Sequence, residues 1–216
     1  QKGWNLQMLK LGIMVSGGGT NLQAIIDNIK SGYLEGCTIA TVVSSRQGAY
    51  ALERAKNNDI PAVCISKKSF PSIEDYDKAL IEHFRSHDID LVVLAGFLSL
   101  LGRDFVEAYR NRIINVHPSL IPSFCGKGCY GIIPHQKALD YGVKVTGATV
   151  HFVDCEYDSG PIILQKAVEV MDDDTPETLQ LRVMQQAEWE LLPKAIRLFK
   201  EGRLAIEGRK VRIIGN

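Results

Sequence analysis

Nearly continuous apolar runs alternate with amphipathic segments along the first half of the chain. The runs are short and rich in Val, Ile and Leu, which is typical of parallel strands buried on both faces. The segments between them carry apolar residues at helical spacing. Strands are predicted at 9–16, 38–45, 62–66 and 89–96, and helices after residue 20 and at 49–59, 72–88 and 102–110. This order predicts an α/β fold with a Rossmann-like, mostly parallel sheet and helices on both faces.

The second half has longer strands and predicts a mixed sheet. The runs 144–154 and 160–170 flank an acidic turn and are expected to pair antiparallel. A long helix, 175–202, opens on a Thr cap, and Pro193 is expected to kink or restart it. A strand at 112–117, a helix at 134–142 and a C-terminal hairpin around Glu207 and Gly208 complete the pattern.

One domain, 8–216, is predicted, because no linker, repeat or low-complexity segment interrupts this pattern. Met8 is expected to be the native start, with residues 1–7 an added or disordered segment outside the fold. The first helix is expected to be capped by Thr20 or Asn21 and to end at Gly32.

Composition narrows the functional classes. Lys plus Arg and Asp plus Glu each number 25 among 216 residues, so no broad basic surface for nucleic acid is predicted. No apolar run approaches the roughly 20 residues that a membrane-spanning helix needs. Five cysteines without framework spacing indicate reduced thiols and a cytoplasmic protein. Cys125 and Cys129 are four apart, but no second ligand pair completes a metal site, so no metal is expected.

An amide and an imidazole stand together where the strand 112–117 ends. Side chains alternate along a strand, so Asn115 and His117 point to the same face, and Pro118 then closes the run. Ligands of open α/β sheets bind at the carboxyl ends of strands. The pair is therefore a candidate site, although polar groups that cap neighbouring backbone are the alternative.

Three further stretches could serve a ligand. The turn Ser16–Asn21, SGGGTN, brings backbone amides and a helix N-terminus together, which suits a phosphate; a tight turn without a ligand is equally compatible. The turn 153–161 holds three carboxylates. Either one of them is presented to the core sheet, or all three form a solvated acidic loop. The segment 95–101 stays apolar beyond its strand and would form either core or a wall for a flat ligand.

These stretches together resemble one family. SGGGTNLQAII, LAGFLSLL, IINVHPSLIP, GATVHFVDCEYDSGPIILQ and AEWELLP occur in the order found in glycinamide ribonucleotide formyltransferases (phosphoribosylglycinamide formyltransferases), which are folate-dependent. The resemblance implies formyl transfer from 10-formyltetrahydrofolate to the amine of phosphoribosylglycinamide in purine biosynthesis. It implies catalytic residues Asn115, His117 and Asp158, and substrate ligands Gly19, Thr20, Asn21 and Glu188. The pterin pocket would be lined by Phe97, Leu98, Ser99, Leu100, Leu101, Val150 and Asp154.

The implied chemistry agrees with these residue types. Asn115 and His117 can donate hydrogen bonds to an oxyanion, and Asp158 is expected to orient His117 and raise its pKa. The implied partners are a ribonucleotide and a folate, and neither nucleic acid nor a membrane is expected. The protein is expected to be a monomer or a homodimer. A hydrolase, another amine acceptor and a non-catalytic binding module are the alternatives.

Two positions depart from the family pattern. Ser99 and Ile73 stand where the family often carries arginines that hold the folate tail. The loop 124–139 is longer than the short form of the family, and its Lys127 and His135 either close over the site or stay on a mobile surface.

Overall fold

The computed structural model describes residues 8–215. The chain divides into two compact units, Gln1–Ile114 and Asn115–Asn216, and the boundary falls inside strand β5 (Ile113–His117). The predicted extra segment 1–7 lies outside the described residues. The single-domain organisation remains a prediction.

The first unit is built on parallel strands, in the hydrogen-bonded order β3-β2-β1-β4. Its strands are β1 (Leu9–Val15), β2 (Cys37–Ser44), β3 (Ala62–Cys64) and β4 (Leu91–Leu94). Every residue of β4 is buried, as the continuous apolar run predicted. The parallel first half is thereby confirmed.

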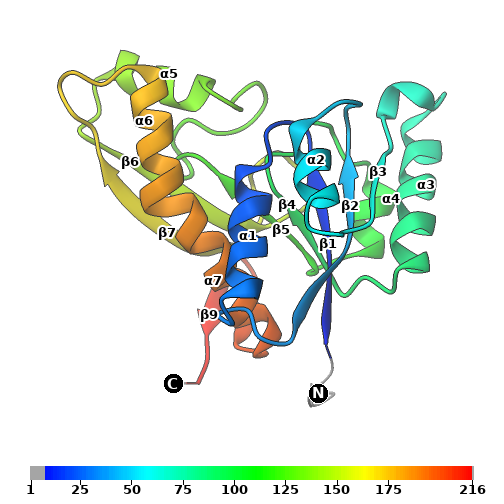
Figure 1. The fold of residues 1–216 in the computed structure, drawn as a ribbon. Coiled ribbons are helices and arrows are strands. Elements are labelled where there is room, and N and C mark those ends of the chain that lie inside the picture. The colour runs from blue at the N-terminus through cyan, green and yellow to red at the C-terminus, as the bar shows by residue number, and fades with distance from the viewer. Residues whose placement is uncertain (1–7, 216) are drawn as a thin grey trace. The chain divides into compact units, whose positions relative to one another are not determined.

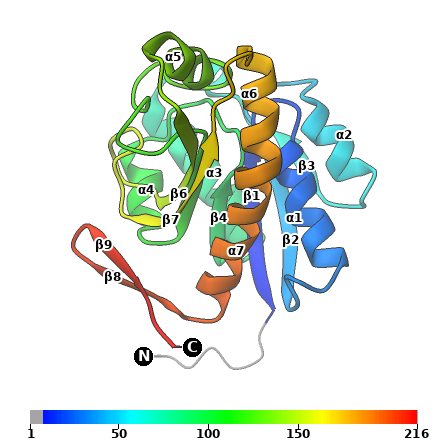
Figure 2. The same ribbon diagram turned by 90° about the vertical axis from the view of Figure 1, so that its left-hand side faces the viewer.

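Helices cover both faces of these strands. Figure 2 shows α1 and α2 on one side of β1 and β4, and α3 and α4 on the other. The helices are α1 (Thr20–Lys30), α2 (Tyr50–Lys56), α3 (Ile73–Ser86) and α4 (Arg103–Ala108), with a short 3₁₀ turn, η1 (Lys67–Ser69). The four α-helices begin and end within a few residues of the predicted positions, whereas the 3₁₀ turn was not predicted.

The N-terminus of α1 differs from the expectation. Its cap is Gly19, with a left-handed backbone at φ 73°, and neither Thr20 nor Asn21 caps it, because both are already helical. A Cβ at Gly19 would lie 2.7 Å from the Cβ and 2.8 Å from the Cα of Ala51. Glycine at this turn is therefore required by backbone conformation and by close packing.

The second unit holds the mixed sheet. Strands β6 (Val145–Phe152) and β7 (Ile162–Glu169) pair antiparallel, as predicted, and β7 pairs parallel with β9 (Lys210–Ile213). The hairpin of β8 (Leu204–Glu207) and β9 is also confirmed. Helix α5 (Ile133–Tyr141) precedes β6 (Figure 1).

The long C-terminal helix is interrupted earlier than predicted. It consists of α6 (Pro176–Val183), a π-helical turn η2 (Met184–Glu188) and α7 (Trp189–Lys200). Thr175 caps α6 as expected, but Pro193 lies inside α7, so the predicted restart there is wrong. The break is instead one widened turn, a feature common at functional sites.

Candidate functional site

Three predicted residues meet in the second unit. Asn115 and His117 project from β5, and Asp158 follows in the loop between β6 and β7. Nδ1 of His117 lies 3.6 Å from Oδ2 of Asp158, too long for a hydrogen bond but close enough for a strong electrostatic attraction when the imidazole is protonated. His117 is only 4% exposed. The imidazole and the carboxylate therefore interact where water screens them little.

The loop after β5 touches both of these groups through its backbone. Nε2 of His117 donates to the carbonyl oxygen of Phe124 at 3.0 Å, because a carbonyl can only accept. The amide of Gly126 donates to Oδ2 of Asp158 at 2.9 Å. Lys127, in contrast, is exposed, and His135 is buried in α5. The loop thus contacts the site, through main-chain atoms rather than through the two side chains singled out in the sequence.

His151 on β6 is a neighbour that the sequence did not reveal. Its Nδ1 donates to the carbonyl of Phe152 at 2.8 Å, so in the neutral ring Nε2 accepts from the Asn115 side-chain amide at 3.2 Å. The same Nε2 lies 3.8 Å from Oδ1 of Asp158. A single histidine in a strand of otherwise uncharged residues was the available signal.

The surroundings set the charges of these groups. Burial lowers the pKa of His117, outweighing the opposite effects of Asp158 and of the Phe124 carbonyl, while His151 lowers it further. Burial alone would raise the pKa of Asp158, but His151, His117 and the Gly126 amide together hold it below its usual range. Asp158 is thus a carboxylate near neutral pH. The expected upward pull of Asp158 on His117 exists, but burial exceeds it.

The glycine-rich turn lies in the first unit. Gly17 and Gly18 are exposed, and Gly19 and Thr20 are half-buried. Asn21 is buried at 6% exposure. The turn leads into the N-terminus of α1, and the anion site there stays a prediction.

The apolar segment after β4 also lies in the first unit. Leu98 and Leu100 are 40% and 41% exposed, and Phe97, Ser99 and Leu101 are half-buried. The amide of Leu98 donates to Oγ of Ser16 at 2.8 Å. This bond fixes the segment beside the end of β1 and leaves two leucine side chains uncovered.

The remaining predicted ligands differ in accessibility. Val150 is completely buried, backbone included, so it presents no surface to a ligand in this conformation. Asp154 is half-buried and accepts from the hydroxyl of Ser159 at 2.7 Å. Glu188 closes the π-helical turn η2 and is only 5% exposed, an unusual position for a carboxylate.

Two features are absent from residues 8–215. No helix there is long and apolar enough to cross a membrane. No group of three or more His, Cys, Asp or Glu side chains in these residues is arranged to hold a metal ion.

Known proteins resemble this chain over nearly its whole length. The formyl transferase family model matches residues 9–196, across both units. The chain is 38% identical over 200 residues to the phosphoribosylglycinamide formyltransferase of Haemophilus influenzae, which covers 93% of this chain and 91% of that protein. The crystal structure of glycinamide ribonucleotide transformylase 1 from Symbiobacterium toebii has a TM-score of 0.91 and 44% identity, over 99% of this chain and 96% of that one.

A relative with a different name also matches. A formyltetrahydrofolate deformylase from Pseudomonas syringae has a TM-score of 0.85 and 28% identity, over 97% of this chain and 67% of that one. The resemblance seen in the sequence motifs is therefore confirmed at the level of the family. The chain is an enzyme of the formyl transferase family.

Proposed function

We propose that this enzyme transfers the formyl group of 10-formyltetrahydrofolate to the amine of phosphoribosylglycinamide. The observation that carries the proposal is the contact of His117 with Asp158 beside Asn115, in a member of the formyl transferase family. The relatives named phosphoribosylglycinamide formyltransferase support this acceptor. The reaction supplies formylated ribonucleotide to purine biosynthesis.

The chemistry is direct attack. The amine nitrogen of the ribonucleotide bonds to the formyl carbon, and the carbonyl electrons move to oxygen to give a tetrahedral oxyanion. The bond from that carbon to N10 of the folate then breaks. The attacking nitrogen loses a proton and N10 gains one, so the proton count balances without a covalent enzyme intermediate.

Asn115 and His117 are the proposed oxyanion donors. The Asn115 amide has two N–H groups, and one of them donates to His151, which leaves the other for the developing oxyanion. Nε2 of His117 donates to the Phe124 carbonyl. Substrate therefore has to displace that carbonyl before Nε2 can donate to the oxyanion. Each donor is worth roughly 3 kcal/mol of transition-state stabilisation.

Asp158 is proposed to favour protonation of His117 when the oxyanion forms. Its carboxylate faces Nδ1 of His117 and favours the imidazolium, which is the stronger donor. The pKa of His117 is lowered chiefly by burial, so the free enzyme holds a neutral ring near pH 7. A negative charge on the bound intermediate would favour protonation at the step where the imidazolium is needed.

The other proposed contacts follow the chemistry of the two substrates. The amides at Gly19, Thr20 and Asn21 would hold the phosphate of the ribonucleotide. Glu188 would accept from its ribose or glycinamide end. The exposed Leu98 and Leu100 offer an apolar wall of the kind that suits the flat pterin ring.

Water is the competing acceptor. The similarity to a deformylase makes hydrolysis of the formyl donor the second candidate function. The two are separated by incubating purified enzyme with 10-formyltetrahydrofolate, with and without the ribonucleotide. The donor is followed by absorbance and the formylated ribonucleotide by mass.

Transfer predicts that the donor is consumed only when the ribonucleotide is present, with one product formed for each donor lost. Equal donor loss in the absence of the ribonucleotide would identify a hydrolase. The assignment of the glycine-rich turn and Glu188 as ribonucleotide ligands would then be rejected.

A further inference from the structure

The loop between β6 and β7 holds Asp158 in an unfavourable backbone conformation. Its φ is 49°, in the left-handed region that residues other than glycine rarely adopt. Such a conformation persists only where the surrounding structure enforces it. The position of the Asp158 carboxylate beside His117 therefore depends on the contacts that fix this loop.

One set of contacts lies within the loop and against β6. The hydroxyl of Ser159 donates to Oδ1 of Asp154 at 2.7 Å, and the amide of Glu156 donates to the same oxygen at 2.9 Å. Gly160 then passes so close to β6 that a Cβ there would lie 1.7 Å from the carbonyl oxygen of Phe152. The loop is thus fixed through its own carboxylate and through its close approach to the strand.

A further contact comes from the C-terminal hairpin. Nη2 of Arg209 donates to the carbonyl oxygen of Ser159 at 2.8 Å, one residue after Asp158 in the chain. Arg209 lies in the turn between β8 and β9, and the next residue, Lys210, pairs with Ile162 at the start of β7. The guanidinium therefore reaches the loop from an element that is itself anchored to the sheet.

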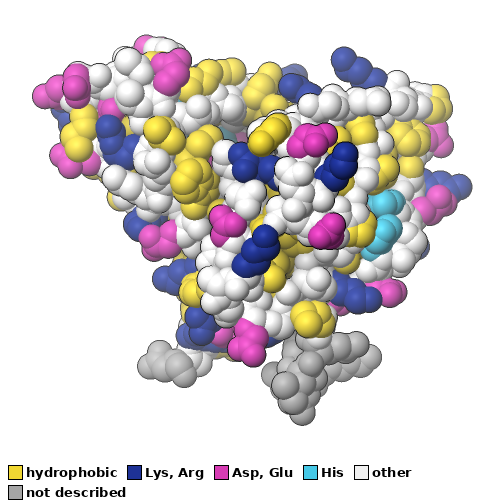
Figure 3. Space-filling model, in the orientation of Figure 1, with side chains coloured by type: hydrophobic (Ala, Val, Ile, Leu, Met, Phe, Trp, Pro, Cys, Tyr) yellow, Lys and Arg dark blue, Asp and Glu magenta, His cyan; other side chains and the backbone are white. Residues whose placement is uncertain are grey.

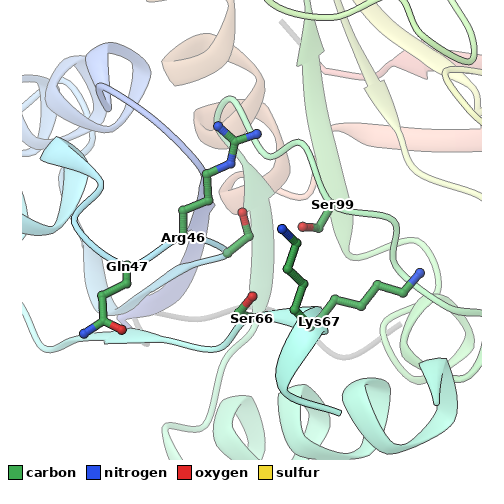
Figure 4. A pocket seen from close by; sticks show the side chains of 7 residues that line it. Arg46, Gln47, Ser66, Lys67 and Ser99 are labelled. Carbon is green, nitrogen blue, oxygen red and sulfur yellow. The ribbon is translucent and has the colours of Figure 1, made fainter. Parts of the chain in front are cut away.

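Exposed cations are common on this protein, so the charge of Arg209 is not the evidence. Acidic and basic side chains are interspersed on the face in Figure 3, and Figure 4 shows Arg46 and Lys67 at a pocket of the first unit. On the hairpin itself, Nε of Arg212 lies 2.9 Å from Oε2 of Glu207. Arg209 differs from these residues in its partner, a main-chain oxygen of the loop between β6 and β7.

We infer that Arg209 is a positioning residue, which holds this loop so that the Asp158 carboxylate faces His117. The inference rests on the proposed function, in which that carboxylate favours the imidazolium. Arg209 acts through Asp158 and not on the reacting atoms. It also lies beyond residue 196, where the match to the formyl transferase family model ends.

The first test titrates His117 by NMR in the enzyme without substrates. Asp158 raises the pKa of His117 against the larger effect of burial, and His151 and His135 are the other titratable groups that interact with it. Arg209→Ala should loosen the loop and lower the proton affinity of His117 roughly twofold to fivefold. The loss of a positive charge alone would act in the opposite direction, because a nearby cation disfavours the imidazolium.

The second test is kinetic and uses a matched control. Arg209→Ala should lower kcat roughly threefold to tenfold while the KM for the ribonucleotide stays within about twofold of the wild type. Arg209→Lys keeps a donor on a more flexible stem and should recover part of the loss. Arg212→Ala removes the same charge from the same hairpin but no contact with the loop, so its kcat should stay unchanged. Equal losses in Arg209→Ala and Arg212→Ala would reduce the hairpin to a structural role and overturn the inference.

The titration separates this inference from the proposed reaction. It needs no turnover, so it decides the role of Arg209 even if the enzyme transfers no formyl group. A lowered proton affinity of His117 in Arg209→Ala, absent from Arg212→Ala, supports the inference. An unchanged or raised proton affinity in Arg209→Ala, or the same change in both variants, would overturn it. A wild type that forms no formylated ribonucleotide would instead reject the proposed function.

Discussion

Nδ1 of His117 lies 3.6 Å from Oδ2 of Asp158, and the same Oδ2 accepts a hydrogen bond from the amide of Gly126 at 2.9 Å. Asp158→Asn keeps the size of the side chain but removes the charge that favours imidazolium. We expect kcat to fall by roughly 10²–10⁴ with little change in either KM, because the charge acts when the oxyanion forms. Steady-state kinetics with both substrates varied checks this. An unchanged kcat would show that Asp158 only shapes the loop.

Asn115 and His151 are expected to act as a donor and its positioning partner. Asn115→Ala removes the oxyanion donor and should lower kcat by roughly 10²–10³. His151→Gln retains an acceptor for the Asn115 amide and should cost less than that. The split between kcat and KM distinguishes positioning from substrate binding. A His151→Gln variant that raises KM and leaves kcat intact would assign His151 to binding instead.

His135 makes the stability of the enzyme sensitive to acid. It is 1% exposed, and within residues 8–215 neither ring nitrogen has a hydrogen-bond partner. Burial, assisted by His117, lowers its pKa from 6.5 to about 4. As pH falls, His135 is therefore protonated at a higher pH in the unfolded chain than in the folded protein. The stabilisation is complete above pH 6.5 and is lost progressively down to pH 4, at a total cost of roughly 3 kcal/mol.

The test measures the free energy of unfolding by urea denaturation at pH 7 and at pH 5, for the wild type and for His135→Leu. The wild type should lose about 2 kcal/mol of unfolding free energy through His135 over this interval. His135→Leu should lose correspondingly less, whatever its stability at pH 7. The lowered pKa of His117 acts in the same direction and remains in both proteins. Equal losses in the two proteins would contradict a buried neutral His135.

Gly19 is expected to matter for both packing and binding. Gly19→Ala places a Cβ against the backbone of Ala51 and at a positive φ, so we expect a loss of at least about 1 kcal/mol in stability. The KM for the ribonucleotide should rise more than the KM for the folate. Gly18→Ala is the matched control, because a Cβ there meets nothing within 4 Å. Equal effects of the two substitutions would reject the special role of Gly19.

Periodicity predicted most of the fold because apolar strands buried on two faces have a strong local signature. The parallel first half, the β6–β7 pair and the terminal hairpin all follow from short-range patterns. The break in the last helix did not, since a π-helical turn at Met184–Glu188 leaves no residue-type signature while Pro193 does. The cap of α1 was missed because two good capping residues follow Gly19 directly.

The candidate site was predictable only in part, because local patterns show spacing along one strand but not contacts between strands and loops. Asn115 and His117 share a face of one strand, so their proximity can be read from spacing. His151 reaches Asn115 from another strand, and the Phe124 carbonyl reaches His117 through the backbone of a loop. Cross-strand register and main-chain contacts depend on tertiary packing, which the local pattern does not encode.

The central claim is that Asn115, His117 and Asp158 carry formyl transfer to the ribonucleotide amine. The most direct measurement gives wild-type and His117→Ala enzyme a ¹³C-formyl donor with the ribonucleotide and counts labelled product by mass. We expect labelled formylglycinamide ribonucleotide from the wild type, and a rate at least roughly 10²-fold lower from the variant, with substrate binding retained. Labelled product at a similar rate from the variant, or none from the wild type, would contradict the account.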